Sequence, residues 1–307
     1  MKKVLVATVK PFAPAAVEQI KNIVEQAGYE FALLEKYNDQ SELIAAVATA
    51  DALIIRSDKA DRQVIEAGKK LKIIVRAGAG YDNIDLEAAT EKGIVAMNTP
   101  GQNSNAVAEL ALGMMVYMAR NLFDGKPGTE LKGKTLGIHA YGNVGRHVAR
   151  IAKGFDMKVS AFDPFIPAET IEKDAVEVLD SVEELYGKNQ YISLHIPANE
   201  QTKNSINYEL MSRMPKGATL VNTARKEVID EHGLLKMFAE REDFRYVSDI
   251  APDCAEEIKE KYTGRFYFTP KKMGAQTAEA NINAGIAAAN QIVNFFEKGD
   301  RRFQVNT

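Results

Sequence analysis

One stretch of the chain, residues 135–163, constrains the possible folds more than any other. It opens with a short apolar run and continues through a glycine-containing turn at 140–145 into a helix-like segment. A second apolar run follows and ends at Asp163. Strand, glycine turn, helix, strand and acid in this order are typical of a dinucleotide-binding βαβ unit. The stretch therefore predicts a parallel α/β sheet that binds a nucleotide at the end of its first strand.

The residues of the turn have separate physical tasks. Gly142 lets the backbone approach a pyrophosphate, and Gly145 lets the helix pack closely on the strand. The N-terminus of the helix offers unpaired N–H groups and the positive end of its dipole to the phosphates. Ala140 stands where the motif usually has its first glycine. We expect a negative φ there, because a side chain disfavours the left-handed region.

The acid that ends the stretch indicates which dinucleotide would bind. Asp163 is suited to accept hydrogen bonds from a ribose diol, and its charge would repel a 2′-phosphate. The sequence therefore favours NAD over NADP. The cofactor-binding residues expected in this stretch are Tyr141, Gly142, Asn143, Val144, Gly145, Asp163 and Pro164.

Length and charge narrow the class of protein. A chain of 307 residues is long enough for two domains of ordinary size. The net charge of −3 provides no basic field for a nucleic acid or an anionic membrane. The most apolar long stretch, residues 106–119, contains Glu109 and is too short to span a membrane. Because the single cysteine, Cys254, suits a reducing compartment, we expect a cytoplasmic protein.

Apolar runs alternate with helix-like segments on both sides of the nucleotide unit, which indicates two parallel sheets. The carboxyl ends of parallel strands lie at one edge of a sheet, and ligands bind at that edge. Read alone, each polar residue there is also compatible with an ordinary loop residue. The polar residues that follow apolar runs are Arg56, Arg76, His195, Arg225 and Asp249.

Several of these stretches resemble the D-isomer-specific 2-hydroxyacid dehydrogenase family, and within it the D-3-phosphoglycerate dehydrogenases. The matching segments occur in the family's order along nearly the whole chain: RAGAGYDNID at 76–85, NTP at 98–100, residues 103–109, the nucleotide turn, and VNTAR at 221–225. The resemblance implies an NAD-dependent oxidoreductase whose partner is a small phosphorylated 2-hydroxy or 2-keto acid. It also implies a homodimer.

The fold implied by the resemblance has two doubly wound parallel-sheet domains. A central Rossmann domain, residues 99–274, would bind NAD. A flavodoxin-like domain would bind the substrate and would consist of residues 1–98 and 275–307. The C-terminal helix would return to complete this second domain.

The resemblance also assigns roles to individual residues. Arg225 would hold the carboxylate and carbonyl oxygen of the substrate, a task that suits its planar guanidinium. Backbone N–H groups of Ala79 and Gly80 would bind the carboxylate. No metal ion is implied. The remaining assignments are Arg56, Ser57, Arg76 and Asn103 for the substrate, with Arg56 and Arg76 on its phosphate, and His195, Ile196, Pro197, Thr223, Ala224 and Asp249 for the cofactor.

The chain departs from the family at the acid/base. The family usually has a Pro-His pair before a Gly-Ala segment, whereas residues 270–275 read PKKMGA. Counting forward from the proline gives Lys271, and counting back from the glycine gives Lys272. We favour Lys272, because the Gly-Ala turn fixes where the chain re-enters the active site. A lysine needs little tuning to act as an acid, but it needs a lowered pKa to act as a base.

The glutamate that usually assists the histidine is also absent. Its position falls near residues 253–254, so Asp253 is the first candidate, with Glu256 and Glu257 as alternatives. The leading interpretation is a D-3-phosphoglycerate dehydrogenase. One alternative is a hydroxypyruvate, glyoxylate or other D-2-hydroxyacid dehydrogenase. The other is an NAD-responsive binding protein without turnover.

Overall fold

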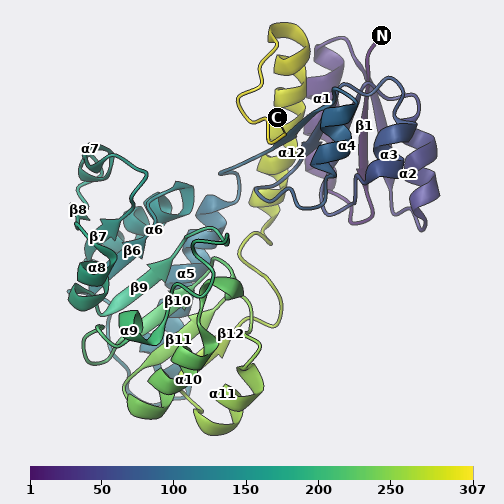
Figure 1. Ribbon diagram of the computed structural model, residues 1–307. Coiled ribbons are helices and arrows are strands. Elements are labelled where there is room, and N and C mark those ends of the chain that lie inside the picture. The colour runs from purple at the N-terminus through teal and green to yellow at the C-terminus, as the bar shows by residue number, and fades with distance from the viewer. Residues whose placement is uncertain (307) are drawn as a thin grey trace. The chain divides into compact units, whose positions relative to one another are not determined.

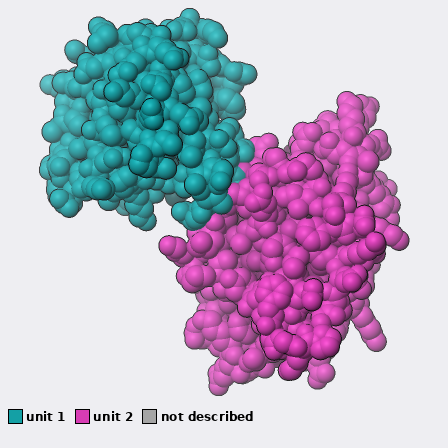
Figure 2. Space-filling view, turned by 180° about the vertical axis from the view of Figure 1, so that it is seen from behind, with its two compact units in different colours: residues 1–103, 276–307 teal, residues 104–275 magenta. Residues whose placement is uncertain are grey.

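The computed structural model describes residues 1–306 and divides into two compact units (Figure 2). Unit 1 comprises Met1–Asn103 and Gln276–Thr307, and unit 2 comprises Ser104–Ala275. Each unit is built around its own parallel sheet (Figure 1). Within the described residues, no helix is both long enough and apolar enough to cross a membrane.

Unit 1 contains a five-stranded sheet in the order β2-β1-β3-β4-β5. All four neighbouring pairs are parallel. This order is that of a flavodoxin-like sheet. Its strands are β1 (Lys3–Thr8), β2 (Glu30–Glu35), β3 (Ala52–Ile55), β4 (Ile73–Arg76) and β5 (Val95–Asn98), and its helices are α1 (Pro14–Gln26), α2 (Gln40–Val47), α3 (Arg62–Ala67), α4 (Leu86–Glu91) and α12 (Ala278–Lys298).

The helices of unit 1 cover both faces of this sheet. Successive strand residues point to opposite faces, so Val4 and Val6 join one core while Leu5 and Ala7 join the other. Helices α1 and α12 cover the first face, and α2, α3 and α4 cover the second. The helix near the C-terminus therefore completes the core that the N-terminal strands begin.

Unit 2 contains a seven-stranded parallel sheet in the order β12-β11-β10-β9-β6-β7-β8. The order reverses between β6 and β9, as at the switch point of a doubly wound dinucleotide-binding fold. Its strands are β6 (Thr135–His139), β7 (Lys158–Phe162), β8 (Glu177–Val178), β9 (Tyr191–Leu194), β10 (Thr219–Asn222), β11 (Arg245–Ser248) and β12 (Phe266–Phe268), and its α-helices are α5 (Ser104–Ala119), α6 (Asn143–Gly154), α7 (Ala168–Glu172), α8 (Val182–Lys188), α9 (Tyr208–Met211), α10 (Glu231–Glu240) and α11 (Ala255–Lys261).

Two hydrophobic cores hold this second sheet. Helices α5 and α6 cover one face through side chains such as Met115 and Val148. Helices α8 to α11 cover the other face, with Tyr186 and Phe238 among the buried side chains. Both units are thus doubly wound, and the predicted α/β fold class is confirmed.

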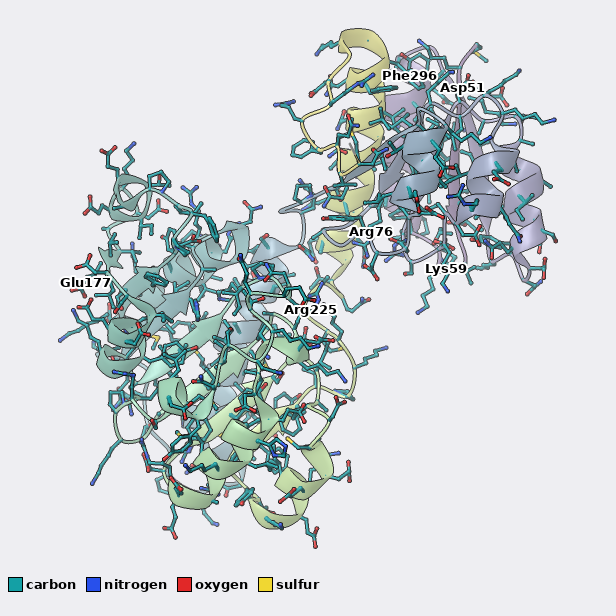
Figure 3. The ribbon with its side chains drawn as sticks, viewed as in Figure 1. Asp51, Lys59, Arg76, Glu177, Arg225 and Phe296 are labelled. Atoms are coloured by element: carbon teal, nitrogen blue, oxygen red, sulfur yellow. The ribbon has the colours of Figure 1, made fainter. Side chains whose placement is uncertain are left out.

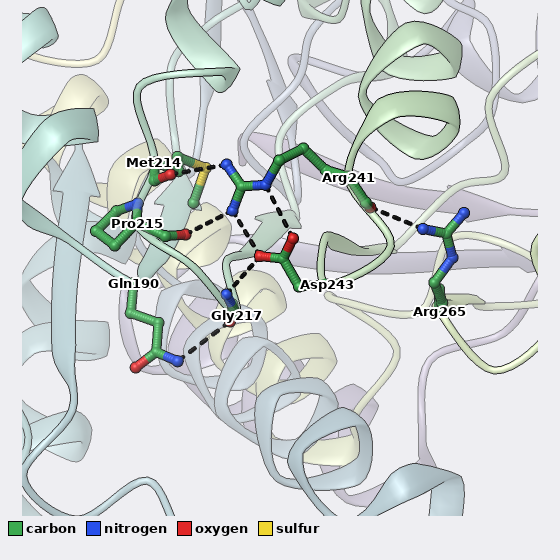
Figure 4. Close-up of polar contacts among 7 residues, drawn as sticks. All are labelled: Gln190, Met214, Pro215, Gly217, Arg241, Asp243 and Arg265. Carbon is green, nitrogen blue, oxygen red and sulfur yellow. Dashed lines mark hydrogen bonds and ion pairs between the residues drawn. The ribbon is translucent and has the colours of Figure 1, made fainter.

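A polar cluster fastens two loops at the amino ends of the unit 2 strands (Figure 4). The guanidinium of Arg241 donates to Asp243 at 2.6 Å and to the carbonyl oxygens of Met214 and Pro215. Asp243 also accepts the N–H of Gly217 at 2.6 Å. The Arg241 hydrogen bond and the Gly217 N–H lower the pKa of the Asp243 carboxyl despite its partial burial.

Candidate active site

The strand register of unit 2 brings the predicted polar residues to one edge of the sheet. His139 pairs with Leu194, which pairs with Asn222, and Asn222 pairs with Ser248. The next residues along β9, β10 and β11 are His195, Thr223 and Asp249. These three residues therefore leave the sheet at the same level, beside the glycine turn that follows β6.

The glycine turn leads into α6 without a side-chain cap. Gly142 is the N-cap and makes no side-chain hydrogen bond to the first turn, so N–H groups there are available to an anion. A Cβ added to Gly145 would lie 2.4 Å from the carbonyl oxygen of Ala140, so only glycine allows this close approach. The open N–H groups fit a bound pyrophosphate, and the close approach at Gly145 fits the packing of α6 on β6.

The expectation of a negative φ at Ala140 is wrong, since its φ is +79°. The chain needs a left-handed residue to turn sharply from β6 into α6, whichever side chain is present. Two contacts support this conformation. The N–H of Ala140 donates to Phe162, and the next N–H, of Tyr141, donates to Asp163 at 2.7 Å.

Asp163 lies directly after β7, and backbone groups fix its carboxylate. Oδ2 accepts the N–H of Tyr141, and Oδ1 accepts those of Phe165 and Ile166. An ionised carboxylate has about four acceptor positions, so one is left for a ribose hydroxyl. Pro164, which follows, is exposed.

The side chain of Tyr141 does not lie on the open surface of the turn. It is fully buried, and its hydroxyl bonds Asp174 at 3.1 Å. A pocket of about 440 Å³ runs along the outer face of α6 beside this contact. Its lining carries three cationic side chains and one acid, and Arg146, in the first turn of α6, pairs with that acid, Asp174, at 3.2 Å. The lining residues are Tyr141, Asn143, Arg146, His147, Ala149, Arg150, Lys153 and Asp174.

The two histidines at this edge are hydrogen-bonding groups rather than proton donors. His195 Nε2 lies 2.9 Å from Ser193 Oγ, and Nδ1 lies 3.4 Å from Thr223 Oγ1. Burial lowers the pKa of His195 to about 3 and that of His139 to about 4. Both rings are therefore neutral near pH 7. After His195 the chain continues through buried Ile196 to exposed Pro197.

Arg225 is exposed at the end of a turn that begins at Asn222 (Figure 3). Asn222 Oδ1 accepts the N–H of Ala224 at 2.9 Å, and its Nδ2 donates to the carbonyl of Arg225 at 2.9 Å. The Arg225 guanidinium donates to the carbonyl of Ala224. Asn222, which had no predicted role, thus shapes the turn that carries the predicted catalytic arginine.

The two candidate lysines lie on an exposed loop after β12, which we call the lysine loop (residues 270–272). Asp249, which is 3% exposed, accepts hydrogen bonds on both sides of this loop. Its Oδ1 accepts from Thr269 Oγ1 at 2.9 Å and from the N–H of Met273 at 2.6 Å. Its Oδ2 accepts from the N–H of Gly274 at 2.8 Å.

The candidate acids are paired with lysines on the surface. Asp253 has a side chain that is 77% exposed, and it binds Lys226 at 2.5 Å. Glu256 and Glu257 pair with Lys259 and Lys261 on their own helix. Glu231, the first residue of α10, is a further functional residue in this region, and no sequence motif points to it. Its carboxylate accepts the N–H groups of Asp253 and Cys254.

Unit 1 gathers its predicted substrate residues at the carboxyl ends of β3, β4 and β5. Arg56 follows β3, and its Nη1 donates to the carbonyls of Lys10 and Pro11, both at 2.9 Å. Its Nη2 bonds Asn281 of α12, and the guanidinium lies 4.8 Å from the centre of the Phe12 ring. Arg56 therefore ties three segments of the unit together at this edge.

Arg76 ends β4 (Figure 3) and donates from Nε to the carbonyl of Arg56 at 3.0 Å. Its guanidinium occupies the space where Gly78 lacks a side chain, since a Cβ there would lie 1.6 Å from Nη1. The following loop is held by Asn98, whose Nδ2 donates to the carbonyl of Ala79 at 2.6 Å.

The other predicted substrate residues are less constrained. Ser57 is exposed beside Arg56, Gly80 follows Ala79 in the loop, and Asn103 is half-buried where unit 1 ends. Among residues 1–306, no group of three or more His, Cys, Asp or Glu side chains is placed to hold a metal ion.

Comparisons with known proteins agree with this architecture. Residues 116–262 match the family described as D-isomer specific 2-hydroxyacid dehydrogenase, NAD binding domain. Hydroxypyruvate reductase of Thermotoga maritima is 39% identical over 285 residues, which cover 86% of this chain and 90% of that protein. The D-3-phosphoglycerate dehydrogenase of Methanocaldococcus jannaschii is 39% identical over 267 residues, which cover 82% of this chain.

A solved structure extends the similarity to the whole chain. The NAD+-bound 3-phosphoglycerate dehydrogenase of Entamoeba histolytica is 50% identical, with a TM-score of 0.86, and the match covers 100% of this chain and 99% of that one. The curated D-3-phosphoglycerate dehydrogenases are longer. This chain spans about half of their length, with 51% for the Methanocaldococcus jannaschii enzyme and 54% for the human enzyme. On these matches, the chain belongs to the D-isomer-specific 2-hydroxyacid dehydrogenase family.

Proposed function

We propose that this protein is an NAD-dependent oxidoreductase that interconverts 3-phospho-D-glycerate and 3-phosphohydroxypyruvate, a step of serine biosynthesis. The observation that carries the proposal is the pair of arginines, Arg56 and Arg76, at the strand ends of unit 1. Two guanidinium groups favour a phosphorylated acid over an unphosphorylated one. The 50% identity with an NAD+-bound 3-phosphoglycerate dehydrogenase supports the same substrate.

The NAD-binding domain, which we propose to span residues 99–274, comprises nearly the whole of unit 2. The first turn of α6 would bind the pyrophosphate, and Asp163 would bind the ribose. Bound NAD supplies the acceptor for the hydride that leaves C2 of the substrate. His195 and Thr223, linked through Nδ1 and Oγ1, would line the cofactor as neutral hydrogen-bonding groups.

Residues of this chain would orient the substrate and move its proton. In unit 1, Arg56 and Arg76 would bind the phosphate, and the backbone of Ala79 and Gly80 would bind the carboxylate. In unit 2, Arg225 would hold the carboxylate and the C2 oxygen. Lys272 would take the proton from the C2 hydroxyl during oxidation and return it during reduction.

The test is NADH oxidation by the purified protein with 3-phosphohydroxypyruvate, hydroxypyruvate and glyoxylate side by side. We expect a strong preference for the phosphorylated acid, and loss of turnover in Lys272→Ala but not in Lys271→Ala. Equal rates on all three acids would contradict the proposed substrate. Bound NADH without turnover on any acid would contradict enzymatic activity and favour the binding-protein alternative.

A second candidate function is the reduction of hydroxypyruvate. The observation in its favour is the Thermotoga maritima hydroxypyruvate reductase, whose length this chain covers to 90%. The two functions differ in their dependence on Arg76. If Arg76 binds the phosphate, Arg76→Ala should lower the rate on 3-phosphohydroxypyruvate far more than the rate on hydroxypyruvate. If it does not, both rates should change alike.

We also propose a homodimer in the cytoplasm. The single cysteine, Cys254, is compatible with a reducing compartment, and burial together with Glu231 raises its pKa to about 12. Sedimentation of the purified protein under reducing conditions would measure its oligomeric state. A monomer at every protein concentration would contradict the dimer.

A further inference from the structure

The segment after β12 carries both candidate acid/base lysines, and one carboxylate holds it from both sides. Residues 270–272 are exposed, whereas Thr269 before them and Gly274 after them are buried. Asp249 bonds the Thr269 hydroxyl on one side and the Met273 and Gly274 N–H groups on the other. The loop between these contacts is short, so fixing its ends also fixes the backbone of Lys272.

These contacts need a hydrogen-bond acceptor at both side-chain oxygens of residue 249. The three partners are all donors, and they reach both oxygens of Asp249. An asparagine would place an NH₂ group against at least one N–H or O–H donor. Because residue 249 is 3% exposed, water has little access to replace the lost bond.

Packing around Gly274 supports the same arrangement. A Cβ on Gly274 would lie 2.8 Å from Asp249 Oδ2 and 3.1 Å from Cγ2 of Val107 on α5. The backbone of Gly274 therefore passes between the carboxylate and the helix at a distance that only glycine allows. Asp249 itself is anchored, since its N–H donates to the carbonyl of Asn222 on the neighbouring strand.

From these contacts we infer that Asp249 is the positioning residue of the lysine loop: its carboxylate closes the loop and thereby places Lys272 for proton transfer. The placement of Lys272 for proton transfer rests on the proposed function, whereas closure of the loop does not. Three hydrogen bonds leave about one acceptor position on the carboxylate. A carboxamide N–H of the cofactor can take that position without opening the loop.

Limited digestion with trypsin tests the closure, because Lys271 and Lys272 are themselves cleavage sites. Cleavage of a closed loop requires local opening, so its rate reports the open population. We expect Asp249→Asn to be cut after residues 271 and 272 about tenfold faster than the wild type, as loss of bonds to a charged acceptor predicts. Thr269→Val, which removes one of the three bonds, is expected to increase the rate about threefold.

Two controls separate local opening from general unfolding. Cleavage after Lys203, on an exposed turn of the same unit, should not change in any of these variants. Asp58→Asn is the matched variant in unit 1. Asp58 is also buried, at 7% exposure, and accepts the N–H of Val9 and the hydroxyl of Tyr37. The Asp58→Asn variant should leave the cleavage rate at the lysine loop unchanged.

The results distinguish this inference from the proposed function. If Asp249→Asn accelerates cleavage, the closure stands even when no 2-hydroxy acid is turned over, and only the role of Lys272 falls. If Asp249→Asn lowers kcat and leaves the cleavage rate unchanged, the closure is overturned and Asp249 acts on the cofactor directly. If Asp249→Asn increases the rate of cleavage after Lys203 by the same factor, the inferred closure of the lysine loop is also overturned. A loss of kcat with unchanged KM, together with faster cleavage, is the result we expect.

Discussion

The side-chain amide of Asn222 holds the backbone of Arg225: Nδ2 of Asn222 donates to the carbonyl of Arg225 at 2.9 Å, while Oδ1 accepts the N–H of Ala224. Asn222 is 2% exposed, so water cannot replace these bonds. Asn222→Ala is expected to reduce kcat/KM by about 10- to 100-fold, because the arginine would lose its fixed position. Steady-state kinetics alongside a thermal melt would measure both effects.

The matched control for this change is Tyr246→Phe. Its hydroxyl accepts from Asn222 Nδ2 at 3.2 Å, so the variant removes one contact of the amide and keeps both contacts to the turn. We expect a lower melting temperature with kcat/KM almost unchanged. If Asn222→Ala destabilises the protein but keeps its kcat/KM, the amide does not position Arg225.

The next prediction concerns Gly78 and the phosphate. A Cβ at residue 78 would collide with Arg76, 1.6 Å from Nη1, and would displace its guanidinium. Gly78→Ala is therefore expected to raise KM for 3-phosphohydroxypyruvate about tenfold or more, while KM for hydroxypyruvate changes little. Initial rates with both acids give this ratio directly.

Gly93→Ala controls for backbone strain in the same unit. Gly93 has a φ of +66°, and a Cβ there would meet no atom within 4 Å. This variant should cost about 1 kcal/mol of stability without altering the ratio between the two acids. An unchanged ratio in Gly78→Ala as well would show that Arg76 does not bind the phosphate.

Strain at Ala140 leads to a stabilising substitution. An alanine with a φ of +79° costs about 1–2 kcal/mol relative to a right-handed conformation. Replacing it with glycine removes this strain, but the greater freedom of glycine in the unfolded chain offsets part of the gain. We expect Ala140→Gly to stabilise unit 2 by about 0.5–1 kcal/mol. Differential scanning calorimetry would detect the rise in melting temperature.

Ala175→Gly separates this strain from nucleotide binding. Ala175 also has a positive φ, of +50°, but it lies outside the glycine turn. Both variants should raise the melting temperature, and only Ala140→Gly should alter NADH affinity, measured by fluorescence titration. A lower melting temperature for Ala140→Gly would mean that the turn gains nothing from glycine.

The sequence was most informative where local chemistry and burial act together. The apolar runs with a polar residue after them became strands whose ends align, as with His195 and Asp249. The long C-terminal helix α12 was also expected, and it does return to unit 1. Periodicity is a strong signal in helices of this length.

Short elements were missed because their signals are weak. Helix α7 follows Pro167 and α11 follows Cys254, and neither of these N-cap residues makes a side-chain cap bond. Strand β8 has only two residues at a sheet edge. Helix α4 does have a capping residue, Asp85, but in the sequence this residue is also the last of the longer motif at 76–85.

Contacts between segments that are far apart in the chain could not be predicted from the sequence. Asp249 meets Thr269 and Gly274 only because β11 and β12 are neighbours in the sheet. The conformation of Ala140 was likewise missed, because the preference of alanine for negative φ was outweighed by the path that the chain must take. Local propensity is overruled at such positions by tertiary structure.

The final prediction uses the pair formed by Arg241 and Asp243 (Figure 4). The pKa of Asp243 is lowered in the folded protein, so its carboxylate contributes stability above its unfolded pKa of about 3.9. This contribution is lost as the pH falls through the folded pKa. Because the side chain is 37% exposed, we expect Asp243→Asn to cost only about 1 kcal/mol at pH 7.

Urea unfolding of the wild type and Asp243→Asn at pH 7, 5 and 3 would measure this difference. It should be largest at pH 7, almost as large at pH 5, and smaller at pH 3, where the carboxyl of residue 243 binds a proton in the unfolded wild type but stays ionised in the folded protein. Glu91→Gln is the control, since Glu91 also pairs with an arginine, Arg62, but has a side chain that is 51% exposed. It should have no measurable effect at any of the three pH values. A constant difference for Asp243→Asn from pH 7 to pH 3 would mean that the amide geometry matters there and the charge of Asp243 does not.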